Sequence, residues 1–318
     1  MTAVSDALAP GGKAFASRSA LWLFWQRFKE DKAAVGAAVV IVLLILIAIG
    51  GGPLAQVLTG HSNNAGYEAT MENSFGLPKG PNAQFWFGAD GSGRDLFVRT
   101  MYGARTSLTV GVVASGIAVL IGLLVGLVAG YYRGIVDTAL SRVGDVMLAM
   151  PSLLISIGIV AACSSSVTGC LDGLIQPGLA LVVCVIVLFS WPYIARLVRS
   201  FTLSLREKEF VEASRSLGAS DLRIIFREIL PNLAGPIIVY TTLLIPQSIL
   251  FEAALSYLGL GVPITTASWG ALLNDAQTYY DTAWWLIVFP GLFLVITTLS
   301  FNLLGDGLRD ALDVRSDR

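Results

Sequence analysis

The chain has 318 residues, of which 55% are hydrophobic and 14% are charged, and its mean hydropathy is +0.72. Soluble domains carry about 25% charged residues, so this composition indicates that lipid surrounds most of the chain. The formal net charge of −1 carries no information about acidic partners, and we expect no nucleic-acid partner.

Six apolar runs are long enough to cross a hydrocarbon core about 30 Å thick, which takes roughly 17 to 25 helical residues. In lipid every backbone amide must be bonded within its own segment, so each run is predicted to be a helix. Only two runs contain a charged residue, Asp145 in the third and Glu252 in the fifth. We therefore expect an all-α integral membrane protein with six transmembrane helices, near residues 34–52, 106–130, 144–162, 178–195, 232–257 and 284–304.

Basic residues are distributed unevenly between the connecting segments. With the N-terminus inside, 17 of the 21 Lys and Arg residues fall in the cytoplasmic segments 1–33, 131–143, 196–231 and 305–318. This asymmetry predicts that both termini lie in the cytoplasm. The first 33 residues lack the apolar core of a signal peptide, so we expect the first span to remain as a membrane anchor.

Residues 1–33 form an N-terminal tail in which residues 21–29 carry aromatic side chains followed by basic ones. This pattern predicts a short interfacial helix at the inner headgroups, although a simple positively charged flank explains it equally well. After the first span at 34–52, residues 53–105 are polar and rich in Gly and Asn. We expect them to form an external loop rather than a separate domain.

Small residues and prolines mark the later spans. Gly122, Gly126 and Gly130 recur at every fourth position of the second span, which predicts a close helix–helix contact, within the chain or with a second membrane subunit. Pro151 and Pro246 are candidate gate residues, because proline removes a backbone hydrogen bond and can kink a helix. Proline is also common in membrane helices generally, which leaves a purely structural role open.

Glu252 is predicted to lie about 8 Å inside the outer end of the fifth span. A charge in hydrocarbon is costly, so its side chain is expected to face the bundle interior or water near an external gate, or else to reach the headgroups. Cys163 and Cys170 flank the external stretch CSSSVTGC. An oxidising environment there would allow a loop-closing disulfide, with two free thiols as the alternative.

The sequence shows no arrangement of residues for catalysis or metal binding. His61 is the only histidine and lies in a polar loop, and no phosphate-cradling G-x-x-x-x-G-K-[ST] motif occurs. We therefore expect no catalytic residue, no metal site and no cofactor in this chain, and expect any energy to come from a partner.

The longest charged interval between apolar runs is residues 205–232, which is predicted to form two short amphipathic helices on the cytoplasmic side. Charged residues such as Glu212 and Arg215 occupy the outer faces of the first helix. The residues at i, i+3, i+4 and i+7, which share one apolar or small face, are Phe210, Ala213, Ser214 and Leu217. That face is expected to contact a partner.

Gly218 is predicted to end the first helix in the left-handed conformation that glycine adopts without steric cost. Ser220 is a candidate N-cap for the second helix, and Asp221 would interact with the positive end of its dipole. The apolar stripe predicted for this second helix contains Leu222, Ile225, Phe226, Ile229 and Leu230.

Glu212-Ala213-Ser214, then Gly218, then Leu230-Pro231, resembles the EAA loop of the membrane subunits of bacterial ABC importers. In that family the loop is a coupling helix that docks in a cleft of the ATPase subunit. The sequence differs from the family pattern at Ser214, where alanine is usual, and at Glu228, where an apolar residue is usual. The resemblance implies that the ATPase-coupling residues are Phe210, Glu212, Ala213, Ser214, Arg215, Leu217, Gly218, Ser220 and Asp221.

Other stretches resemble the subfamily of ABC permeases that import dipeptides and oligopeptides, at residues 86–95, 103–108, 257–261, 268–275 and 302–313. The resemblance implies the type I ABC importer permease fold, with a five-helix core over 106–308 and a cytoplasmic tail over 309–318, in the bacterial plasma (inner) membrane. It also implies the partners: a homologous second permease, two ATPase subunits that bind ATP and Mg²⁺, and an external binding protein that delivers the peptide substrate.

Three alternatives remain at this point. An ABC permease for another solute, such as nickel or a sugar, would share most of these features. An ion-coupled transporter would need ionisable residues along its spans, and almost none are present. An integral membrane enzyme would need clustered titratable groups near one interface, and the sequence shows none.

Overall fold

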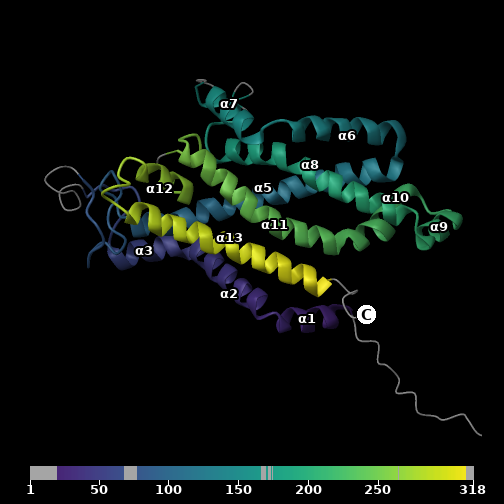
Figure 1. The fold of residues 1–318 in the computed structure, drawn as a ribbon, viewed down its shortest axis with the longest axis horizontal. Coiled ribbons are helices and arrows are strands. Elements are labelled where there is room, and N and C mark those ends of the chain that lie inside the picture. The colour runs from purple at the N-terminus through teal and green to yellow at the C-terminus, as the bar shows by residue number, and fades with distance from the viewer. Residues whose placement is uncertain are drawn as a thin grey trace, which may run out of the picture.

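The computed structural model describes residues 20–67, 77–165, 170, 173, 175–263 and 265–312. In these parts of the chain the regular elements are helices, and the only β-structure consists of isolated bridges. The long apolar helices lie side by side along the molecule's long axis (Figure 1), which confirms the predicted all-α architecture. The five segments that are long and apolar enough to cross a membrane are Lys32–Thr59, Leu96–Tyr132, Leu179–Arg206, Asp221–Tyr257 and Trp285–Leu312.

The N-terminal part begins with the separate short helix that the sequence predicts, α1 (Ala20–Glu30). The Asp31 side chain then caps the next helix by accepting hydrogen bonds from the Ala33 and Ala34 amides. The first apolar helix is longer than the predicted span at 34–52. It passes through a π-helical turn without a break and ends at Thr59. The three consecutive pieces of this helix are α2 (Lys32–Leu46), η1 (Ile47–Gly51) and α3 (Gly52–Thr59).

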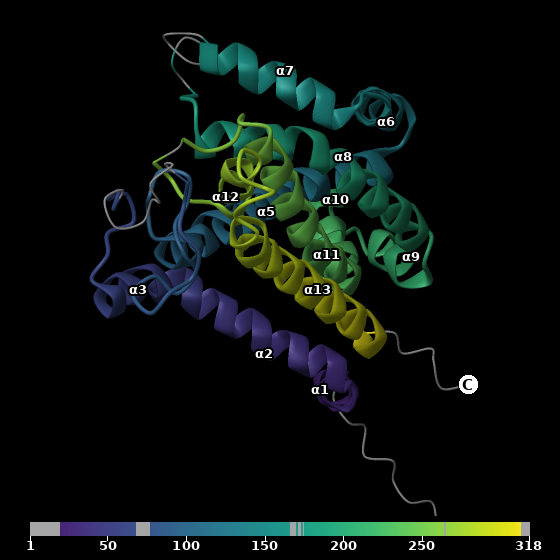
Figure 2. The ribbon, with the colours of Figure 1, turned by 60° about the vertical axis from the view of Figure 1, so that its left-hand side comes forward.

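The third predicted span is not one continuous helix. α6 (Gly134–Ala149) and α7 (Ser152–Ser165) meet at an angle of 85°, and Figure 2 shows the pair beside α8, away from α2 and α13. Met150 adopts an extended conformation because the ring of Pro151 disfavours a helical residue before it. The span predicted near 144–162 is therefore bent at Pro151, where the sequence allowed a kink, and the described residues give six spans only if this bent pair is one span.

The central contact of the bundle joins α5 (Leu96–Tyr132) to α8 (Leu179–Arg206) through the predicted glycine stripe. A Cβ atom added at Gly126 would lie 2.6 Å from the Ala195 carbonyl oxygen, and one added at Gly122 or Gly130 would lie 2.8 or 2.9 Å from a carbonyl oxygen of α8. Only glycine allows so short an approach of two helix backbones. The predicted helix–helix contact is confirmed, and it lies within this chain.

The two ends of the bundle differ. At one end lie residues 77–95 and α12 (Trp269–Ala276), which precedes α13 (Trp285–Leu312). At the other end lie α9 (Glu209–Ser216) and α10 (Asp221–Arg223) (Figure 1). We refer to them as the α12 end and the α9 end. At the α12 end Trp269 is fully buried, and its indole Nε1 donates a hydrogen bond to the Thr100 carbonyl at 3.1 Å. Because α3 ends at Thr59 and α5 begins at Leu96, the connecting loop is shorter than the predicted 53–105.

We expect Gly126→Ala to weaken the contact between α5 and α8, because the new methyl group would collide with the Ala195 carbonyl. The free energy of unfolding should fall by about 1–3 kcal/mol, as it does in overpacked cores. A lower unfolding temperature of the purified chain in detergent would measure this. Gly116→Ala is the matched control, because nothing lies within 4 Å of its Cβ position on the same helix. Equal effects of the two substitutions would contradict the close approach.

Candidate functional site

The charged segment after α8 folds into a helical hairpin at the α9 end. It consists of α9 (Glu209–Ser216), α10 (Asp221–Arg223) and η3 (Ile224–Ile229), which continues into α11 (Leu230–Tyr257). Gly218 between the two arms has a φ of +81°, and the Ala219 amide donates to the Ser214 carbonyl at 3.1 Å. The predicted left-handed glycine at the end of the first helix is confirmed.

Ser220 precedes α10 in an extended conformation, but its side chain makes no capping hydrogen bond. The predicted cap therefore exists only as a backbone contact, from the Ile224 amide to the Ser220 carbonyl at 3.0 Å. Asp221 instead accepts a hydrogen bond from the Tyr131 hydroxyl of α5 at 2.7 Å. This bond fixes the second arm of the hairpin to the end of the central helix pair.

Burial in the first arm leaves the predicted partner face uncovered. Phe210 is exposed and Leu217 is 89% exposed, whereas Val211, which sequence reasoning did not single out, is fully buried in one cluster with Val198 of α8.

The stripe predicted for the second arm is divided. Ile225 and Ile229 are buried in the same cluster, together with Ile224, which was not predicted. Leu222 and Phe226 are exposed, because η3 is π-helical and shifts the side chains relative to the 3.6-residue period. The hairpin thus presents apolar side chains that this chain does not cover.

Charges around the hairpin are exposed. Arg133 pairs with Glu207 at 2.5 Å, and Arg206 donates to the Tyr131 carbonyl. Glu212 and Arg215 are exposed, and the Glu212 carboxylate has no ion-pair partner in the parts of the chain that the structure describes. Ala213 is exposed as well, so the predicted coupling residues of α9 lie together on the surface of the hairpin.

The candidate gate residues do not form one site. Pro151 is exposed at the bend between α6 and α7, whereas Pro246 is buried inside α11. Glu252 is fully buried near the α12 end of α11, where it accepts hydrogen bonds from Ser107 at 3.1 Å and Ser256 at 2.6 Å. The expectation that Glu252 faces the bundle interior is confirmed, and the alternative of a carboxylate at the headgroups is excluded.

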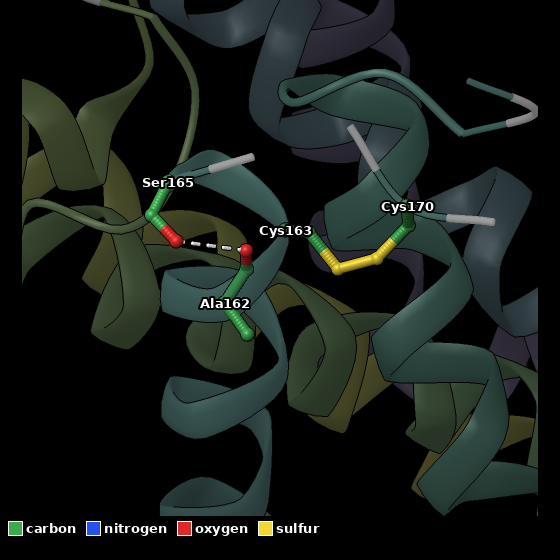
Figure 3. Close-up of a disulfide and its surroundings, with 4 residues drawn as sticks. All are labelled: Ala162, Cys163, Ser165 and Cys170. Atoms are coloured by element: carbon green, nitrogen blue, oxygen red, sulfur yellow. Dashed lines mark hydrogen bonds between the residues drawn. A yellow bond between two sulfur atoms is a disulfide. The ribbon is translucent and has the colours of Figure 1, made fainter. Parts of the chain in front are cut away.

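Cys163 and Cys170 are joined by a disulfide in the structure, with Cα atoms 4.8 Å apart (Figure 3). On the α7 side, the Ser165 hydroxyl donates a hydrogen bond to the Ala162 carbonyl at 2.9 Å. Cys184 is an exposed free thiol. The bridge therefore closes the connection between α7 and α8.

A buried cluster of charges at the α12 end was not predicted. The Asp90 carboxylate is fully buried and binds Arg94 at 2.7 Å and Arg99 at 3.1 Å, and Arg94 also reaches Asp275 of α12 at 3.4 Å. Burial raises the pKa of the Asp275 carboxyl, and the charge of Asp90 raises it further, whereas Arg94 and Arg99 lower it. The Asp90-x-x-x-Arg94 spacing was the available sequence signal, but it does not identify Asp275.

Asp90→Asn should destabilise the chain strongly, because it removes the buried negative charge that the guanidinium groups of Arg94 and Arg99 share. Losing one partner of a buried ion pair costs about 3–5 kcal/mol. Asp145→Asn is the matched control, because it breaks the exposed pair with Arg196, and such pairs contribute about 0–1 kcal/mol. Thermal unfolding in detergent measures both, and a similar shift for the two variants would contradict the burial.

Residues 122–318, more than half of the chain, match the family described as binding-protein-dependent transport system inner membrane component. The chain belongs to this family. It is therefore a multi-pass permease of the inner membrane. Residues 19–69 also match the N-terminal TM domain of oligopeptide transport permease C. Among the described residues no group of three or more His, Cys, Asp or Glu side chains could hold a metal ion.

Named relatives are similar over nearly the whole permease. The dipeptide transport system permease protein of Alkalihalophilus pseudofirmus is 42% identical over 91% of this chain and 88% of its own. A glutathione transport system permease protein of Escherichia coli is 43% identical over 91% of this chain and 89% of its own.

Solved structures show the same fold. The MetNI methionine ABC transporter in an inward-facing conformation aligns with a TM-score of 0.52 at 20% identity, over 66% of this chain and 94% of that one. An amino acid ABC transporter crystallised with histidines aligns with a TM-score of 0.51 at 18% identity, over 66% and 92%. The predicted ABC importer permease fold is confirmed.

Proposed function

We propose that this permease is the transmembrane subunit of an ATP-driven importer that moves dipeptides and oligopeptides delivered by an external binding protein. The observation that carries the proposal is the hairpin at the α9 end, which is anchored through Val211 and Ile224 but leaves Phe210 and Leu217 uncovered. Family membership and the dipeptide and glutathione permeases among its relatives support the class of solute.

The expected partners follow from what the chain lacks. It has no phosphate-binding motif, so two ATPase subunits would bind ATP and Mg²⁺ and receive the exposed face of α9. A homologous second permease would complete the membrane part, and the external binding protein would dock at the α12 end. The basic residues near the α9 end support a cytoplasmic position for that end, and α1 and the end of α13 lie toward it in Figure 1.

Movement of the hairpin would be transmitted along one continuous helical segment, which we call the rod. From Asp221 to Tyr257 the chain is helical without a break, because η3 joins α10 directly to α11. A push on α9 would reach the first turn of this rod through the contact of Val211 with the cluster around Ile224. The rod then carries the displacement across the membrane to Glu252.

Glu252 would act as a latch at the external gate. Its carboxylate holds α11 against Ser107 of α5, and the same Ser107 hydroxyl accepts a hydrogen bond from the Trp269 amide at 3.3 Å. α5, α11 and α12 therefore meet at one buried carboxylate. A shift of α11 would either break these hydrogen bonds or move α12 together with α11. Pro246 lies inside α11, at a position where the helix can bend.

Uptake by the assembled transporter tests the substrate class. In cells without another peptide transporter, we expect labelled dipeptide to accumulate only when this chain, its sister permease, both ATPases and the binding protein are present. Accumulation of nickel or a sugar in place of peptide would overturn the peptide assignment. Uptake by this chain without the ATPases, driven by a proton gradient, would overturn the ABC mechanism itself.

Gly218→Val should lower peptide uptake about tenfold while the chain remains inserted. A β-branched residue costs about 1–2 kcal/mol or more in the left-handed region, and a tenfold effect corresponds to about 1.4 kcal/mol. Nothing lies within 4 Å of a Cβ atom at this position, so the backbone conformation alone is responsible. Gly218→Asn is the control, because asparagine tolerates this conformation. Normal uptake by Gly218→Val at normal membrane levels would refute the hinge.

A further inference from the structure

A groove of about 590 Å³ runs between α8 and α11. Each helix contributes one row of side chains at i, i+3 and i+7, which places each row on one helical face. The rows are Tyr193, Arg196 and Ser200 on α8, and Tyr240, Leu243 and Gln247 on α11. All of these except Leu243 are polar and exposed, whereas the other residues that line the groove, Ile194, Leu197 and Leu244, are apolar.

Other exposed faces of the bundle have a different composition. On α2 the large exposed side chains over 33–46 are aliphatic, and the same is true of α13 over 287–299. Those faces suit contact with lipid tails. The groove does not, because the exposed Gln247 amide and the exposed hydroxyls of Tyr193 and Tyr240 lie within predicted spans and would lose their hydrogen bonds to water there.

Gln247 gives the strongest indication. It lies ten residues from the nearer end of α11, at Tyr257, which is about 15 Å along the helix axis. Its side chain cannot span that distance to the headgroups. Its exposed amide forms no hydrogen bond with the parts of the chain that the structure describes. The groove therefore faces water or a polar solute at the depth of Gln247.

Arg196 adds a positive charge that can change its partner. It pairs with Asp145 of α6 at 2.8 Å, but both side chains are largely exposed, at 62% and 50%. Such pairs contribute about 0–1 kcal/mol, so a competing carboxylate can replace Asp145 at little cost. Arg196 also lines a second cavity of about 280 Å³ between α5, α6 and α8.

We propose that this groove is a binding surface for the peptide during its passage. The Gln247 amide and the Tyr193 and Tyr240 hydroxyls hydrogen-bond the peptide backbone, and Arg196 exchanges Asp145 for the C-terminal carboxylate. These contacts are independent of the peptide's side chains, so the surface accepts short peptides of varied sequence that have a free carboxylate. The inference rests on the proposed function and assigns the occupant as the peptide rather than the sister permease.

Cysteine accessibility in the assembled transporter tests the occupant. In a Cys184→Ser background, we expect Gln247→Cys to react with a charged methanethiosulfonate reagent, and to react at least about threefold more slowly during turnover with dipeptide, binding protein and ATP. Ile238→Cys is the control, because nine residues place it on the opposite face of α11, where it is also exposed. It should not react with the charged reagent.

Three results would overturn the proposal. Gln247→Cys that reacts only with an apolar maleimide would face lipid. Gln247→Cys that is unreactive in the complex but reactive in the isolated chain would be covered by the sister permease. If dipeptide does not slow the reaction of Gln247→Cys with the charged reagent, the groove contains water but does not bind the substrate. Reagent access does not depend on which solute is transported, so these results are distinct from failure of wild-type peptide uptake.

Dipeptides with a free and with an amidated C-terminus test the role of Arg196. Arg196→Gln should lower uptake of a dipeptide with a free carboxylate about three- to tenfold relative to its C-terminal amide, and Arg196→Lys should restore most of the difference. Comparing the two peptides within each variant cancels effects on folding and on ATP hydrolysis. An equal loss for both peptides would overturn the assignment of the carboxylate contact.

Discussion

The close approach of α5 and α8 is the contact on which the rest of the bundle depends. In lipid, apolar side chains gain nothing from meeting each other rather than hydrocarbon, so helices associate where their backbones can come near. Gly122, Gly126 and Gly130 provide that surface. Their position also places Tyr131 and Val198 side by side, and these residues form the cluster that receives Val211 of the hairpin. The helix pair therefore sets where the hairpin stands.

The two ends of the molecule differ in how far their ion pairs are buried. At the α12 end Asp90, Arg94 and Arg99 are buried and bound to each other, which fixes the loop before α5 and makes that end rigid. Toward the α9 end the pairs of Arg133 with Glu207 and of Arg196 with Asp145 are exposed and weak, and only the pair of Arg199 with Asp137 is partly buried among the ion pairs described there. A rigid end suits a docking platform, and weak pairs suit a part that must move.

Hydropathy alone predicted the helical architecture, because a long apolar segment in lipid must satisfy its backbone hydrogen bonds within itself. Gly218 and the glycine stripe could be read from the sequence as well, since each depends on local geometry. The sequence allowed a bend at Pro151, but the 85° angle could not be predicted, because it depends on what the two halves pack against. The Asp90 cluster was missed because Arg94 and Asp275 lie 181 positions apart in the chain.

The stripe predicted for the second arm of the hairpin is divided between a buried and an exposed side, and the cause has a further consequence. η3 accommodates one more residue per hydrogen-bonded turn than an α-helix does. Each residue of an α-helix turns the chain by about 100°, so the surplus residue sets the rotation of α9 about the axis of α11. The direction in which the exposed Leu217 points is thus determined by the number of residues between Ile224 and Ile229. Deleting one residue from this stretch would remove a single side chain and yet rotate the whole first arm about the axis of α11.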